Sequence, residues 1–120
     1  MDGTAIANRY IALWNETDPT RRAALLAETF TPNATYSDPI MSGTGHAEIG
    51  ALIAGVQARF PSYRFALIGT PEQVKEHLRF SWSLGPAHDP ATIKGTDFAQ
   101  LDGARFASMT GFLDQVPAAA

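Results

Sequence analysis

The hydrophobic residues of this chain change their spacing halfway along it, and that change limits the folds open to it. Up to residue 60 they recur at the three- and four-residue intervals of helices, and beyond residue 61 they alternate with polar residues as in strands. Helices followed by strands predict an α+β domain with the helices packed on one face of a sheet. A chain of 120 residues, 45% of them hydrophobic, is the size of one domain with one core.

Three helices are expected in the first half. The apolar residues of 4–16 share one helical face, and a second helix follows an N-cap at Asp18. A short strand over 35–38 then leads into a third helix, which ends before Pro61 and is expected to be largely buried.

Four strands are expected in the second half, around residues 63–67, 74–84, 92–101 and 105–113. The turn Asp102-Gly103 is typical of a tight hairpin between the last two. The sequence predicts one domain over residues 1–116 and a disordered tail at 117–120.

Composition excludes several classes of function. The net charge is −3 and the nine Lys and Arg residues are scattered, so no nucleic-acid partner is expected. Without cysteine there is no thiolate nucleophile, and the three histidines are too far apart for metal-ligand spacing, so no metal is predicted. No apolar run approaches a membrane span, and no basic leader opens the chain, which favours a cytoplasmic protein that does not bind membranes.

Three segments resemble one known superfamily: Tyr10–Asp18, Phe30–Pro39 and Ser42–Ile49. They are similar to the nuclear transport factor 2-like proteins, in particular to the ketosteroid isomerases and the SnoaL-like polyketide cyclases. The resemblance covers nearly the whole chain. It implies a cone-shaped α+β barrel, with three N-terminal helices packed in a strongly curved mixed or antiparallel sheet. It also implies proton-transfer chemistry without a cofactor.

The resemblance assigns catalytic roles to three residues. Asp38 takes the place of the base that moves a proton between carbons, although Asp-Pro is also a common turn opener whose carboxylate accepts a backbone N–H. Asp97 shares its strand parity with apolar residues, so it is expected to face inward and to be protonated, as a donor to an oxyanion. The motif Gly95-Thr-Asp97 also resembles superfamily members without isomerase activity. Tyr10 takes the place of the oxyanion-hole tyrosine, or it is a packed core tyrosine.

The chain also departs from the isomerase pattern. The third helix of those enzymes usually supplies a second tyrosine, and Ile53 stands at the matching position. An epoxide-hydrolase variant of the fold needs an arginine in the site, but Arg79 has the parity of the polar strand face. Residues expected to line a pocket for a flat apolar ligand, or else to fill the core, are Trp14, Tyr36, Ile40, Met41, Ile53, Val56, Trp82, Met109 and Leu113.

Two functions are compatible with these residues. One is a cofactor-independent proton-transfer enzyme, an isomerase or aldol cyclase, acting on a small apolar carbonyl compound. The other is a non-catalytic small-molecule-binding or assembly domain of the same fold. In either case a homodimer is expected, paired through the outer sheet face that carries His77, Arg79, Ser81 and Ser83.

Overall fold

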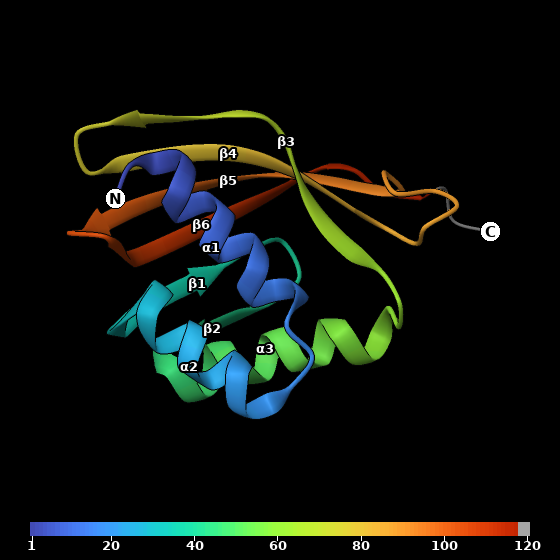
Figure 1. Cartoon of the computed structure of the whole chain (residues 1–120), viewed down its shortest axis with the longest axis horizontal. Helices are drawn as coiled ribbons and strands as arrows, with labels where there is room; N and C mark the ends of the chain where they lie inside the picture. The colour runs from blue at the N-terminus through green and yellow to red at the C-terminus, as the bar shows by residue number, and fades with distance from the viewer. Residues whose placement is uncertain (118–120) are drawn as a thin grey trace.

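Three helices pack against the inner side of a curved six-stranded sheet (Figure 1). The computed structural model describes residues 1–117, so residues 118–120 of the expected tail lie outside the described residues. The helices are α1 (Gly3–Asn15), α2 (Pro19–Thr29) and α3 (Gly45–Arg59), and the strands are β1 (Phe30–Ser37), β2 (Ser42–Thr44), β3 (Arg64–Val74), β4 (His77–Gly85), β5 (Ile93–Asp102) and β6 (Arg105–Gln115). The α+β fold expected from the sequence is confirmed.

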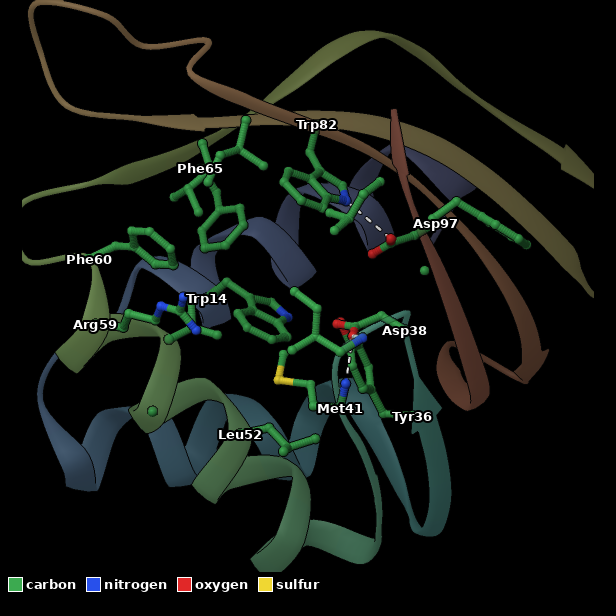
Figure 2. A pocket seen from close by; sticks show the side chains of 18 of the residues that line it. Trp14, Tyr36, Asp38, Met41, Leu52, Arg59, Phe60, Phe65, Trp82 and Asp97 are labelled. Carbon is green, nitrogen blue, oxygen red and sulfur yellow. Dashed lines mark hydrogen bonds between the residues drawn. The ribbon is translucent and has the colours of Figure 1, made fainter. Parts of the chain in front are cut away.

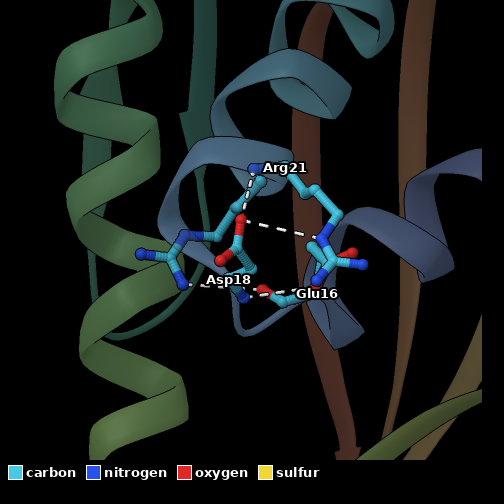
Figure 3. Close-up of polar contacts among 4 residues, drawn as sticks. Glu16, Asp18 and Arg21 are labelled. Carbon is cyan, nitrogen blue, oxygen red and sulfur yellow. Dashed lines mark hydrogen bonds and ion pairs between the residues drawn. The ribbon is translucent and has the colours of Figure 1, made fainter.

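The helical hairpin is fixed by side-chain caps. The Asp2 carboxylate accepts the backbone N–H of Ala5 at the start of α1 (2.8 Å). The predicted N-cap of α2, Asp18, accepts the N–H of Arg21 at 2.9 Å and also faces its guanidinium, while Glu16 accepts the N–H of Asp18 (Figure 3). These contacts satisfy backbone donors that a helix start leaves open.

The sheet has the order β2-β1-β6-β5-β4-β3 and is not closed. All neighbours are antiparallel except β1 and β6, which run parallel with Ser37 beside Thr110. The first strand is longer than the four residues expected, because Phe30 already pairs with Phe106. The last strand, β6, thus lies between β1 and β5 near the centre of the sheet.

Two tight hairpins connect the long strands. The predicted turn at Asp102-Gly103 is present, with Gly103 at a positive φ of 64° that glycine adopts without strain. A second turn follows Val74, with Lys75 at φ 53°. Val74 therefore ends β3. The sequence had placed it at the start of the next strand, because it alternates with the later residues, and that prediction is wrong.

The prediction that α3 is largely buried is wrong. Only Ile49 and Ile53 of this helix are buried, because a single face packs on the core. Leu52 and Val56 are half-buried and border a cavity. None of the helices in residues 1–117 is long and apolar enough to cross a membrane.

Candidate active site

Three adjacent strands bring the two predicted catalytic aspartates together. Asp38 follows the end of β1, Asp97 lies on β5, and Gly111 of β6 lies between them, paired with Asp97. A Cβ at Gly111 would be 2.9 Å from Asp97 Oδ1 and 3.3 Å from the Cβ of Asp38. The missing side chain therefore leaves the two aspartates on either side of bare backbone.

Asp97 points inward, as its parity predicted, and is 2% exposed. Its Oδ2 accepts the Tyr10 hydroxyl at 2.9 Å, and its Oδ1 accepts the Trp82 indole N–H at 3.0 Å. Burial raises the pKa of Asp97 from 3.8 to about 6, although the hydrogen bonds from Trp82 and Tyr10 oppose that rise. The expected protonated form therefore dominates only below about pH 6.

Asp38 lies in the turn that follows β1. Its Oδ1 accepts the backbone N–H groups of Ile40 (2.8 Å) and Met41 (2.9 Å), and its Oδ2 accepts the Tyr36 hydroxyl at 2.7 Å. The carboxylate thus caps the turn, as the Asp-Pro interpretation predicts, and it also lines the cavity. The Oδ1 oxygen therefore accepts both backbone hydrogen bonds of the turn, and the Oδ2 oxygen accepts only the hydrogen bond from the uncharged Tyr36 hydroxyl.

The Tyr10 hydroxyl reaches the site from the buried face of α1. Its ring packs edge-on against Phe80 and Phe106, with centroids 5.2 and 5.4 Å away. Burial and the nearby charge of Asp97 raise the pKa of Tyr10 well above its ordinary value. Burial and the same charge also raise the pKa of Tyr36. Both phenols consequently keep their protons and serve as donors.

Gly95 explains how Trp82 reaches Asp97. The two residues are cross-strand partners, and the indole lies over the bare glycine backbone. A Cβ on Gly95 would be 2.2 Å from Cζ2 of Trp82 and 2.7 Å from the carbonyl oxygen of Phe112. The Gly-x-Asp spacing therefore has a packing reason: the glycine makes room for the indole that donates to the aspartate two residues later.

Gly95→Ala is expected to destabilise the protein by about 1 to 3 kcal/mol, because the ring has to move to accommodate the methyl group. Urea unfolding measures the loss. Gly55→Ala is the control, since a Cβ there meets no heavy atom within 4 Å and alanine favours a helix. Equal stability of Gly95→Ala and wild type would contradict the packing argument.

The carboxylates open onto a cavity of about 550 Å³, large enough for a small organic ligand (Figure 2). Its wall is mostly apolar. The residues predicted for the lining that do line it are Trp14, Tyr36, Ile40, Met41, Val56, Trp82 and Leu113. The other two, Ile53 and Met109, are buried in the core: Ile53 has 0% exposure and Met109 has 1%. Both side chains belong to the hydrophobic core and do not line the cavity.

Sequence reasoning missed two members of the site, Gly111 and Arg59, and one contact of a third, Tyr36. Gly111 separates the two aspartates, and a glycine inside a strand is itself a signal of a close approach. Tyr36 was expected in the lining, but its hydrogen bond to Asp38 was not. Arg59 lines the cavity from the last turn of α3, where it had no distinguishing pattern.

Within residues 1–117, no group of three or more His, Asp or Glu side chains is placed to hold a metal ion. At the aspartate end of the cavity, the polar groups are two carboxylates, two phenols and the Trp82 indole. Such a set can accept a proton and donate hydrogen bonds to an oxygen that gains charge.

Known proteins with this architecture share its helices and sheet. The model of the SnoaL-like domain matches residues 7–109. A candidate isomerase of the SnoaL-like family from Agrobacterium tumefaciens is 39% identical, covers 95% of this chain and 99% of its own, and has a TM-score of 0.89. A protein with a ketosteroid isomerase-like fold from Catenulispora acidiphila, in complex with trimethylamine, is 17% identical, with coverage of 88% and 82% and a TM-score of 0.73.

A candidate SnoaL-like polyketide cyclase from Jannaschia sp. is 15% identical, with coverage of 91% of this chain and 85% of its own and a TM-score of 0.70. No protein of curated function matches the sequence. The distant structures show the cone-shaped fold of the nuclear transport factor 2-like superfamily. Because the domain model spans most of the sequence, the chain belongs to the SnoaL-like family.

Proposed function

We propose that this protein is a cofactor-independent proton-transfer enzyme, an isomerase or aldol cyclase, that acts on a small apolar carbonyl compound. One observation carries the proposal: two aspartates flank Gly111, each bonded to a protonated tyrosine, at the wall of an apolar cavity. Pairs of acids in different environments are the usual means of dividing base and acid roles.

Asp38 is the proposed base. The turn occupies its Oδ1, while Oδ2 keeps a lone pair beside the Tyr36 hydrogen bond. It takes a proton from the carbon next to the substrate carbonyl. The C–H electron pair becomes the C=C bond of a dienolate, and the carbonyl oxygen takes the negative charge. Protonated Asp38 then returns the proton to the γ-carbon, which restores the carboxylate and leaves the conjugated isomer.

Tyr10 and neutral Asp97 are the proposed donors to the oxyanion. They lie 2.9 Å apart, so one oxygen can accept from both once the hydrogen bond between them is exchanged for bonds to the ligand. In an aldol cyclase the same enolate would form, and its carbon would attack a second carbonyl of the substrate. Both reactions use the same acid and base, and the names of the similar proteins include an isomerase and a cyclase.

The alternative is a binding domain without chemistry. The capped turn at Asp38 is the observation that favours it, since its carboxylate already serves the backbone. The neighbour that holds trimethylamine shows that a related cone can hold a small molecule.

The proposal is tested by isomerisation of a cyclic β,γ-unsaturated ketone, followed by the ultraviolet absorbance of the conjugated product. Turnover above the buffer rate, slowed by a saturated cyclic ketone of the same size, is expected. Failure of this ketone and of acyclic diketones to react, with binding detected by tryptophan fluorescence, would favour the binding domain.

We also propose a homodimer formed by the outer sheet face. This face carries Phe98, 45% exposed, beside His77, whose ring stacks on it at 5.6 Å. Ser81 and Thr96 share a hydrogen bond there (2.8 Å), so the surface mixes apolar and polar groups that a two-fold axis can match.

Light scattering should give the dimer mass for wild type and the monomer mass for Phe98→Asp. Val74→Asp, at the exposed hairpin tip, is the control. A monomeric wild type would refute this interface.

A further inference from the structure

Arg59 is the one basic residue among the described residues that line the cavity. It ends α3, and Figure 2 shows it with Phe60 at one end of the cavity, while Asp38 and Asp97 lie at the other with Trp14 between. The cavity therefore has a positive end and a negative end, joined by apolar wall.

The Arg59 guanidinium is not engaged by a carboxylate. Among residues 1–117 it forms no ion pair, whereas Arg21 pairs with Asp18 and Arg79 with Glu72. Its neighbour is the Phe60 ring, whose centroid lies 5.5 Å from Cζ. A guanidinium held over an aromatic ring keeps its N–H donors free for a planar anion such as a carboxylate.

We propose that the natural ligand carries an anionic group, a carboxylate or its equivalent, at the end opposite its reacting carbonyl. The carbonyl would lie at Tyr10 and Asp97, the apolar body along Trp14, and the anion at Arg59. The assignment rests on the proposed function for the position of the carbonyl. The Asp38 carboxylate repels an anion from the aspartate end of the cavity, so the charge pattern selects one of the two possible orientations.

The two tryptophans of the chain, Trp14 and Trp82, both line the cavity, so tryptophan fluorescence reports directly on its occupancy. The probes are 4-phenylbutanoate and its uncharged analogue 4-phenylbutanamide, titrated into the intact protein at low salt. We expect the acid to bind about fivefold more tightly than the amide, the scale of a partly exposed ion pair. Added salt should reduce that preference.

Three variants locate the preference. Arg59→Gln should make the two dissociation constants equal, and Arg59→Lys should keep part of the difference. Arg64→Gln is the matched control, because Arg64 also forms no ion pair within residues 1–117 but does not line the cavity. Equal binding of acid and amide by wild type, or a preference that survives in Arg59→Gln, would overturn the proposal.

This measurement does not depend on turnover. A retained preference for the acid with no isomerisation of any ketone would refute the proposed chemistry and leave the anion site standing. Turnover of neutral ketones with no preference for the acid would do the reverse.

Discussion

Asp38→Asn is expected to lower the rate of ketone isomerisation at least 100-fold, the usual contribution of a positioned general base. The amide cannot take up the proton from carbon. Its oxygen can still accept the backbone N–H groups of Ile40 and Met41, so the turn and the fold should survive. The measurement is kcat at saturating ketone, with unchanged urea unfolding as evidence of an intact fold.

The chain contains its own control for this substitution. Asp89 also precedes a proline, is exposed in the β4–β5 loop, and does not line the cavity. Asp89→Asn should therefore leave kcat unchanged. Activity in Asp38→Asn within a few-fold of wild type would remove Asp38 from the base role and confine it to the turn.

Local patterns in the sequence were enough to place the inward-facing members of the site. Strand parity put Asp97 on the buried face, and helical spacing put Tyr10 on the inner face of α1. These predictions hold because side-chain direction follows the two-residue and 3.6-residue periods whatever the neighbours are. The same logic failed for α3, because periodicity shows which face is apolar but not whether that face meets the core or a cavity.

The meeting of Asp38 with Asp97 could not be predicted from spacing. It depends on the parallel pairing of β1 with β6, two strands about 70 residues apart, and on Gly111 between them. The resemblance to the isomerases predicted that Asp38 acts as a base and Asp97 as an acid, but it did not predict that Gly111 separates them. The hydrogen bond from Trp82 likewise depends on its position opposite Gly95, a cross-strand relation that a single strand does not reveal.

The site departs from the isomerase pattern at the third helix, but it still contains a second tyrosine. Ile53 fills the core where a second tyrosine was expected on the third helix. Tyr36 of β1 presents a hydroxyl to the cavity instead, bound to Asp38. The second phenol is thus placed next to the proposed base, as a hydrogen-bond donor to its carboxylate.

Turnover by wild type is expected to fall as the pH rises through about 6, the pKa of Asp97. Only neutral Asp97 can donate to the oxyanion, and the ionised form repels it. The protonated fraction is half at the pKa and about one hundredth two pH units above it, so kcat/KM, which reports the ligand-free enzyme, should drop roughly 50-fold from pH 6 to pH 8. The substrate for this measurement is an uncharged ketone, so that no titration of the substrate contributes to the pH profile.

Two variants assign that fall to Asp97. Asp97→Asn should remove the pH dependence in this range at a lower rate, since the amide donates a weaker hydrogen bond and does not titrate. Trp82→Phe deletes a donor that lowers the pKa of Asp97, so the fall should move to higher pH. A rate that instead rises through pH 6 would exchange the roles: ionised Asp97, held by Tyr10 and Trp82, would be the base, and Asp38 would act only through its turn.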